Sequence, residues 1–300
     1  PIYGFTNISD ALIFDLVEHP IFQRLRRISQ LGLTYLVYPG AYHTRFHHAL
    51  GAMHLMQKAI STLKSKGHEI TLDEEQAVLI AILLHDVGHG PFSHALEHSI
   101  VSGINHENIS MLIMDKLNYE FKGKLSLAIK IFRNEYSKAF LHQLISSQLD
   151  VDRLDYLKRD SFYSGVSEGI INEDRIISML NVSNGNLVVD AKAIYSIEKF
   201  IIARRLMYWQ VYLHKTVLSA EFSLVQALKR AKTLVKNGVD IFSTSALREF
   251  LQNDHSLENF KINAKLLDLF CQLDDIDIMS SIKEWTQHPD TVLSVLSKNI

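Results

Sequence analysis

Histidine and aspartate are concentrated in one part of this chain. Ten of its 15 histidines lie between positions 43 and 106. The densest string, LLHDVGHGPFSH, places His85 and Asp86 side by side at the end of an apolar segment. An imidazole and a carboxylate at such a place are unstable unless they are paired or bound. Together they suit a divalent ion such as Zn, Fe, Mn, Ni or Co, so this string predicts metal chemistry.

A second imidazole ligand is expected from the helix that Thr44 can cap. His47 shares a face of that helix with His54 and Lys58, which is typical of a solvated stripe. His48 lies on the apolar face and is the predicted ligand. The alternative for His48 is a core histidine with a hydrogen-bonding partner, and His47 is expected at the surface.

A carboxylate ligand is expected from a charged segment further along the chain. Asp152, Tyr156 and Asp160 are spaced i, i+4 and i+8 and therefore form one stripe of a helix. Such a stripe is typical of one wall of a site. The alternative is a solvated helix face that carries i, i+4 ion pairs such as Asp155 with Arg159.

The elements that must position these residues are predicted to be helices. The chain has 300 residues, only 5 prolines and 13 glycines, and 47% hydrophobic residues. The turn Asn184-Gly185 between apolar runs predicts one small β-hairpin within 178–190, so the expected fold is mainly α. The expected helices are two short ones within 9–31 separated at Pro20, one after Thr44, and those at 74–86, 106–117, 124–132, 139–160 and 191–236. The tail 241–300 has helical periodicity.

Composition narrows the class of protein. With 31 basic and 33 acidic residues the net charge is -2, which argues against binding to nucleic acid or to an anionic membrane surface. Apolar runs such as 77–84 are far shorter than the roughly 20 residues of a membrane span. A single cysteine, Cys271, excludes internal disulfides and Cys-based zinc sites. We therefore expect a soluble cytoplasmic protein without a targeting signal.

The order of these motifs resembles the HD superfamily of metal-dependent phosphohydrolases, whose signature is H…HD…D. The likeness is closer to the deoxynucleoside triphosphate triphosphohydrolase branch and covers about residues 1 to 215. The strings that carry it are FQRLR (22–26), QLG (30–32), PGAYHTRFHHALG (39–51), HDVGHGPFSH (85–94) and VDRLDY (151–156). The resemblance implies an HD-domain helical bundle. We expect a catalytic domain over 1–225 and a helical C-terminal extension over 226–300, and the alternative is that the two form one continuous unit.

The resemblance also implies roles for individual residues around one divalent ion, which could be Mn, Mg, Fe, Ni or Zn. The implied metal ligands are His48, His85, Asp86 and Asp152. The implied catalytic histidines around the scissile phosphorus are His89, His94 and His106, with His94 as general acid or as an aid to the nucleophile.

The implied substrate contacts are of three kinds. Those on the polyphosphate are Arg45, Arg153, Arg204 and Lys215, with Tyr156 nearby. Gln30 and Asp160 would recognise the sugar 3′-hydroxyl, and Tyr212 would pack against the sugar and base. In the best-known members of the branch the position of Arg153 is a lysine, a change that keeps the charge but alters its geometry.

The first functional hypothesis is hydrolysis of a deoxynucleoside triphosphate to nucleoside and inorganic triphosphate, by a homo-oligomer that is a dimer or tetramer. A second is an HD phosphohydrolase that acts on another nucleotide, such as a monophosphate, a diphosphate or an alarmone. A third is a nucleotide-binding sensor or scaffold with little turnover. The alternative to all three is that the histidines are scattered through a helical core and have only a structural role.

Overall fold

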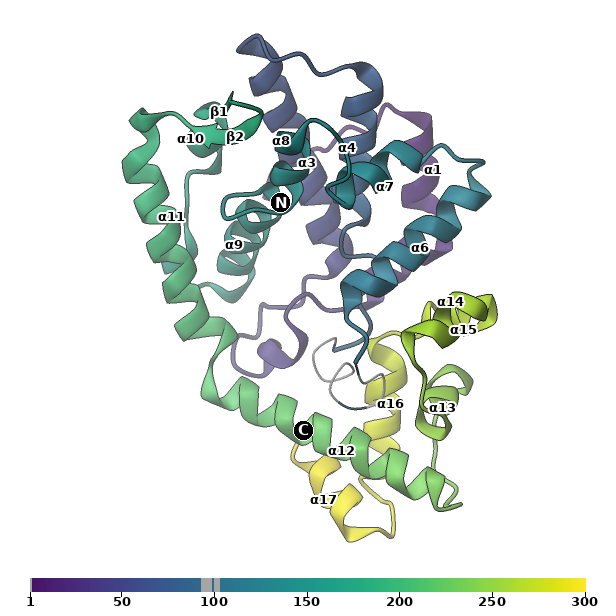
Figure 1. Ribbon diagram of the computed structural model, residues 1–300. Coiled ribbons are helices and arrows are strands. Elements are labelled where there is room, and N and C mark those ends of the chain that lie inside the picture. The colour runs from purple at the N-terminus through teal and green to yellow at the C-terminus, as the bar shows by residue number, and fades with distance from the viewer. Residues whose placement is uncertain (1, 93–98, 100–102) are drawn as a thin grey trace.

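The computed structural model describes residues 2–92, 99 and 103–300 of the chain. These residues form a bundle of helices with one two-stranded antiparallel sheet, which confirms the mainly α fold that the sequence predicts (Figure 1). The predicted catalytic residue His94 lies outside the described residues.

The N-terminal helices are short because the sequence ends each of them early. Asp10 caps α1 (Ala11–Glu18) by accepting a hydrogen bond from the Ile13 amide at 3.0 Å. Pro20 then begins α2 (Pro20–Gln23), so the predicted break at this proline is confirmed. Two 3-10 turns follow, η1 (Arg24–Arg27) and η2 (Gly32–Leu36).

Three helices form the centre of the bundle and carry the candidate metal ligands. They are α3 (Arg45–Ser65), α4 (Leu72–Leu84) and α9 (Val151–Ser164), and α3 packs against both of the others. Thr44 caps α3 as predicted. Helix α4 is buried from Ala77 to its last residue, Leu84, so its end places His85 in the interior.

Helix α4 packs against α7 (Ser126–Phe132) and α8 (Ala139–Ile145), and α6 (His106–Glu120) packs against α7. The prediction of one helix over 139–160 was wrong, because α8 ends at Ile145 and α9 begins at Val151. Asp150 separates them, since its carboxylate accepts from the Ser147 and Arg153 amides at 2.8 Å each. This break puts Asp152 in the first turn of α9.

The predicted hairpin is confirmed. After η3 (Ser167–Gly169) and α10 (Glu173–Ser178), strand β1 (Leu180–Ser183) pairs antiparallel with β2 (Asn186–Val189). Asn184 and Gly185 have φ of 50° and 77°, which a tight two-residue hairpin turn requires.

The prediction of one helix over 191–236 was also wrong. The segment contains η4 (Ala191–Ala193), α11 (Ile194–Met207), the π-helical turn η5 (Tyr208–Tyr212) and α12 (Lys215–Lys236). His214 starts a new helix because its Nδ1 accepts from the Thr216 amide at 3.3 Å.

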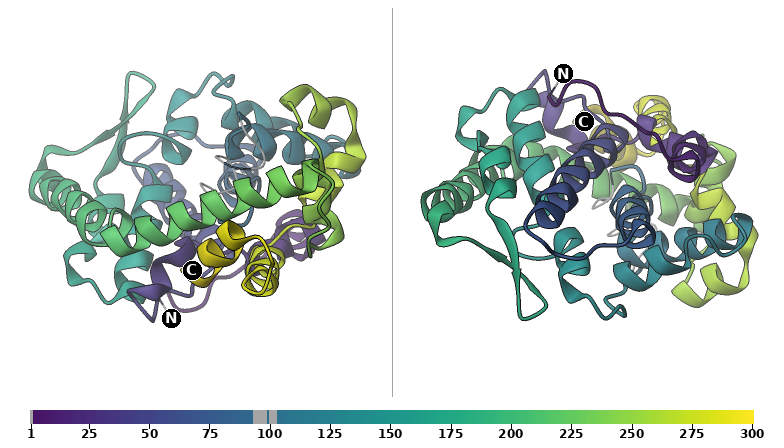
Figure 2. Two further views of the ribbon diagram at one scale, coloured as in Figure 1. Left: turned by 90° about the horizontal axis from the view of Figure 1, so that it is seen from below. Right: turned by 90° about the horizontal axis from the view of Figure 1, so that it is seen from above.

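The tail is helical, as its periodicity predicts. It forms α13 (Ser245–Gln252), α14 (Leu257–Ile262), α15 (Ala264–Phe270), α16 (Asp275–Trp285) and α17 (Thr291–Lys298). Helix α12 runs unbroken through residue 225, and α17 packs back on it, as the view from below also shows (Figure 2, left). Within the described residues, no helix is both long and apolar enough to span a bilayer.

Helix α3 comes close to side chains of α9 at Gly51. A Cβ at this position would lie 2.0 Å from Nη2 of Arg159 and 2.1 Å from Oδ1 of Asp155. These two side chains form a buried ion pair in α9 with both bonds at 2.8 Å. Only glycine leaves room for this pair.

Replacing Gly51 with alanine is therefore expected to destabilise the protein by about 2 kcal/mol or more, because the buried pair must move. The same change inside an uncrowded helix stabilises by up to about 1 kcal/mol. Chemical unfolding measures the effect, and Ser61→Ala on the exposed side of α3 is the control. A Gly51→Ala protein of unchanged or higher stability would contradict this packing.

Candidate metal centre and active site

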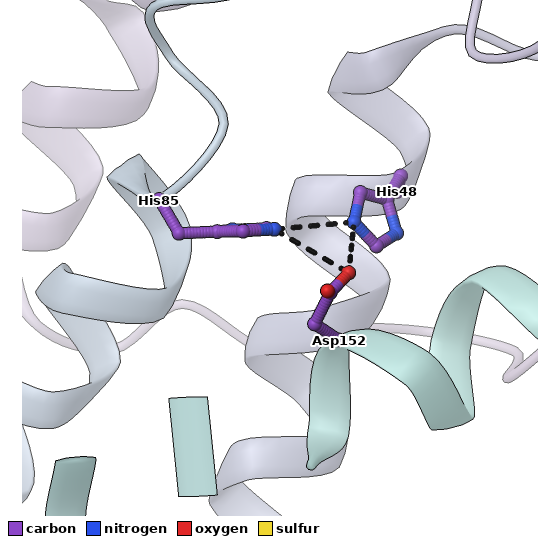
Figure 3. Close-up of side chains that lie close together, drawn as sticks. All are labelled: His48, His85 and Asp152. Carbon is purple, nitrogen blue, oxygen red and sulfur yellow. Dashed lines mark hydrogen bonds and ion pairs between the residues drawn. The ribbon is translucent and has the colours of Figure 1, made fainter. Parts of the chain in front are cut away.

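Three side chains from three helices meet at one point (Figure 3). His48 projects from the first turn of α3, His85 follows the last residue of α4, and Asp152 lies in the first turn of α9. Nε2 of His48 lies 3.0 Å from Oδ1 of Asp152 and 3.4 Å from Nε2 of His85. Nε2 of His85 lies 3.5 Å from the same Asp152 oxygen.

In each imidazole ring, the nitrogen that faces away from the common centre has a hydrogen-bond acceptor. Nδ1 of His85 donates to the Ile82 carbonyl at 2.7 Å, and Nδ1 of His48 lies 2.7 Å from Oδ2 of Asp155. When both Nδ1 atoms carry the proton, both Nε2 lone pairs point at the common centre. This arrangement orients histidine ligands in many metal sites.

The cluster fits a divalent ion. Ligand atoms at the observed separations match neighbouring positions around an ion with bonds of about 2.1 Å. Burial alone would lower the pKa of His48, but hydrogen bonds to Asp152 and Asp155 reverse this and raise it to about 10. An ion at this place would have to displace that proton, so its binding releases a proton. Two imidazoles and a carboxylate suit several divalent ions and do not select one.

Asp86 joins this cluster to a second one formed with His89 and His106. Oδ1 of Asp86 lies 3.4 Å from Nε2 of His85 and 3.3 Å from Nε2 of His89. Its other oxygen accepts from Arg45 at 2.6 Å. The predicted ligand Asp86 therefore faces the centre with one oxygen and a phosphate-binding candidate with the other.

The two described catalytic candidates lie against each other. The rings of His89 and His106 stack with centroids 3.8 Å apart. Burial and then the nearby Arg45 charge lower the pKa of His89 to about 3. His89 is therefore a neutral imidazole at physiological pH.

The turn that carries His85, Asp86 and His89 is anchored by two residues that sequence reasoning did not single out for this role. Arg24 is buried and donates from Nη2 to the Val87 and His89 carbonyls at 2.9 Å each. The Ser110 hydroxyl donates to the His85 carbonyl and accepts from the Gly88 amide, both at 2.9 Å. No local sequence pattern marks either contact, because each spans more than 20 residues.

The stripe on α9 is present, and its far end is buried. Asp160 accepts from the Tyr212 hydroxyl at 2.8 Å and lies 2.7 Å from Nε2 of His43. Tyr156 contacts the Tyr212 ring edge to face at 6.2 Å. Burial raises the pKa of Tyr156 to about 12, so its hydroxyl stays protonated. These side chains form a continuous wall from Asp152 to the η5 turn.

The other predicted substrate contacts are placed as follows. Gln30 lies beside His43, whose carbonyl accepts from the Gln30 amide at 3.0 Å, and Oε1 of Gln30 is a buried oxygen with no partner among the described residues. Arg153 donates to the Ser147 carbonyl at 2.8 Å and pairs with Asp150.

Two further cations lie near η5. The Arg204 guanidinium lies 5.9 Å from the Tyr208 ring centre, and Lys215 is exposed at the start of α12.

The remaining clustered histidines are not among the site residues that the resemblance implies. His47 is exposed and His48 is buried, as the helix face of each predicts, and the choice of His48 as a metal ligand stays a prediction. The others are His43, buried and stacked on Tyr163 at 4.6 Å, His54, stacked on Tyr3, His68, bonded to Asn181 at 2.6 Å, and His98, which lies outside the described residues.

Comparison with known families agrees with this fold and site. Residues 45–160 match the HD domain, and residues 171–265 match the HD associated region. The chain belongs to the HD-domain phosphohydrolase family and is a hydrolase of that class. HD domains bind divalent metal ions, and the cluster around His48 could hold one.

Three relatives illustrate the likeness. A phosphohydrolase crystal structure from Bacteroides thetaiotaomicron is 57% identical with a TM-score of 0.97, over 99% of this chain and 75% of that one. Protein YwfO of Bacillus subtilis is 34% identical over 99% of this chain and 68% of its own length. A deoxynucleoside triphosphate triphosphohydrolase SAMHD1 homolog of Dictyostelium discoideum is 32% identical over 78% of this chain and 49% of its own length.

Asp155 lies behind the candidate metal centre, although its i, i+4 spacing to Arg159 suggested only a solvated ion pair. Asp155→Asn is expected to weaken metal binding about 10- to 100-fold, because the amide accepts less strongly from His48 Nδ1. Competition with a chelator measures this affinity on the folded protein. Asp174→Asn, which removes the partner of Lys58 at the surface, is the control. Equal metal affinity in the two variants would refute this role of Asp155.

Proposed function

We propose that this HD-domain phosphohydrolase hydrolyses deoxynucleoside triphosphates to nucleoside and inorganic triphosphate. The observation that carries the proposal is the α9 stripe, which joins the metal cluster at Asp152 to Tyr156 and to the Tyr212–Asp160 bond. Asp152 and Asp160 are two turns apart, about 12 Å along the helix. One helix face thus offers a place for a phosphate at the metal and for a sugar and base beyond it.

The roles that we propose are those that the family resemblance implies, and the neighbours of some of these residues support them. We propose His48, His85, Asp86 and Asp152 as the metal ligands. Arg45 is proposed to neutralise phosphate charge, because its guanidinium already lies 2.6 Å from Asp86 at the edge of the cluster. Arg153, Arg204 and Lys215 are proposed to hold the outer phosphates. With a net charge of -2, the protein must grip a polyanion through such local cations.

In the proposed hydrolysis, the ion and the histidines have different chemical roles. A divalent ion, when bound, supplies Lewis acidity and a water of lowered pKa. His89 and His106 are proposed to flank the scissile phosphorus, and His94 is proposed as general acid or as an aid to the nucleophile. The neutral state of His89 allows it to donate a hydrogen bond to a phosphoryl oxygen without holding a full charge there.

The deoxynucleotide substrate is further supported by the Dictyostelium relative, whose name is that of a deoxynucleoside triphosphate triphosphohydrolase homolog. Four candidate cations exceed what a monophosphate needs, which favours the triphosphate over the other nucleotides. This chain spans about half the length of that relative. The substrate proposed for this chain is therefore inferred from the part that the two proteins share.

The first test identifies the products formed from a panel of nucleotides. With Mn or Mg, the protein is expected to release nucleoside and triphosphate from deoxynucleoside triphosphates, as measured by ion-exchange chromatography. Release of only orthophosphate or pyrophosphate would overturn the proposal. Turnover of a monophosphate or an alarmone alone would favour the second hypothesis, and tight binding without product over hours would favour a sensor.

A matched pair of variants compares the loss of a histidine in the metal cluster with the loss of a histidine at the surface. His85→Ala is expected to abolish product release because it removes a ligand candidate at the centre. His47→Ala should retain activity because His47 is exposed one residue from the ligand candidate His48. Equal activity in both variants would contradict the assignment.

Gln30 is proposed to accept a hydrogen bond from the sugar 3′-hydroxyl, because its Oε1 is buried without a partner in the described chain. Gln30→Ala is expected to reduce the preference in kcat/KM for a 2′-deoxy over a 2′,3′-dideoxy nucleotide by about 3- to 10-fold. Gln57→Ala, on the outer part of α3, is the control. A preference unchanged by Gln30→Ala would exclude this contact.

A further inference from the structure

His43 is a buried imidazole to which the proposed function gives no role. It is 1% exposed and lies two residues before α3 begins. Its Nε2 atom lies 2.7 Å from Oδ1 of Asp160 in α9, and its carbonyl accepts from the Gln30 amide at 3.0 Å. His43 therefore contacts both of the residues that the family resemblance assigns to the sugar 3′-hydroxyl.

The loop that carries His43 is packed tightly against the end of α9. The imidazole stacks on the Tyr163 ring with centroids 4.6 Å apart and an angle of 17° between the planes. A Cβ at Gly40 would lie 2.6 Å from the Tyr163 carbonyl oxygen, which is closer than a side chain permits. An antiparallel bridge between Ser29 and Thr44 joins the neighbours of Gln30 and His43. The backbone as well as the stack therefore fixes the position of this ring.

The two nitrogens of His43 have different surroundings. Nε2 faces the Asp160 carboxylate, whereas Nδ1 is buried and has no hydrogen-bond partner among the described residues. A proton on Nδ1 would be a buried donor without an acceptor, which is unfavourable. The surroundings therefore favour the tautomer with its proton on Nε2, which donates to Asp160.

The Asp160 carboxylate then has a protein donor on each of its oxygens. The Tyr212 hydroxyl donates to Oδ2 at 2.8 Å, and His43 donates to Oδ1. Burial and then the charge of Asp160 raise the pKa of Tyr212 well above its usual range, so the hydroxyl keeps this proton. Donors at both oxygens fix the plane of the carboxylate. Each oxygen can accept a second hydrogen bond, so Asp160 offers only acceptors to a ligand.

We propose that His43 is a positioning residue for the sugar end of the site, which holds Asp160 through its imidazole and Gln30 through its carbonyl. This inference rests on the proposed function. A 3′-hydroxyl has one proton, whereas Oε1 of Gln30 and the Asp160 carboxylate are both acceptors. The two can share that proton in a three-centre bond only if both are directed at one point, and a common anchor provides this geometry.

Two substitutions separate the hydrogen-bond donor of His43 from its ring. His43→Phe keeps a ring that can stack on Tyr163 but removes the donor to Asp160. His43→Gln keeps an N–H donor on a side chain of similar reach and removes the ring. NMR titration of the metal-loaded protein gives the dissociation constants of a 2′-deoxynucleoside and of its 2′,3′-dideoxy counterpart. Neither ligand has a phosphate, so the ratio of the two constants is independent of turnover.

The wild-type protein is expected to bind the 2′-deoxynucleoside more tightly than the dideoxy compound. His43→Phe is expected to lower this preference about 3- to 10-fold, because a carboxylate with one donor fewer is held less firmly. His43→Gln should stay close to the wild-type preference. His68→Phe, which removes a hydrogen bond to Asn181 beside the hairpin, is the control and should leave it unchanged.

A purely structural role of His43 would give a different result. It predicts lower stability in thermal unfolding with an unchanged preference, or an equal loss of preference in His43→Phe and His43→Gln, and either result would overturn the proposal. Equal binding of the two nucleosides by the wild-type protein would overturn it as well. Nitrogen-15 NMR of the wild-type protein tests the tautomer without any substitution, and a proton on Nδ1 of His43 would also contradict it.

Failure of the proposed function is distinguishable from failure of this inference. Release of only orthophosphate or pyrophosphate from nucleotides, together with a preference for the 2′-deoxynucleoside that depends on the His43 donor, would contradict the triphosphate product alone.

Discussion

The buried carboxylate of Asp155 is the constraint on which the rest of the centre depends. It accepts two hydrogen bonds from Arg159 and one from His48, all between side chains that are almost fully buried. Burial would raise the pKa of Asp155, but these partners lower it and keep the group charged. A charge in the core is stable only while all its partners are present, so α3 and α9 are held in one relative position.

The atoms that face the proposed ion are therefore positioned by hydrogen bonds that their residues make on the side away from the ion. His48 is oriented by Asp155, His85 by the Ile82 carbonyl, and the turn after His85 by Arg24 and Ser110. Arg45, in turn, holds Asp86 at the boundary between the two clusters. The site is built from helix ends and their hydrogen bonds, which fixes its geometry before any substrate arrives.

Sequence periodicity predicted what depends on helix faces. It separated exposed His47 from buried His48 and placed Asp152, Tyr156 and Asp160 on one stripe, and turn chemistry located the hairpin. It failed where a single polar side chain caps the start of a new helix, as Asp150 and His214 do within segments of helical pattern. Periodicity also could not predict that the Asp155–Arg159 ion pair is buried. The i, i+4 spacing is the same whether such a pair faces water or another helix.

The hydrogen bonds of Arg24 have a consequence for how the molecule opens. Its guanidinium joins the carbonyls of Val87 and His89, in the turn beside the metal centre, to the Leu273 carbonyl at 3.1 Å, just before α16. Detaching α16 would leave a buried guanidinium short of an acceptor, at a cost in free energy that the turn must share. Amide hydrogens of the turn and of the C-terminal helices should therefore exchange together, as one cooperative unit, although more than 180 residues separate them in sequence.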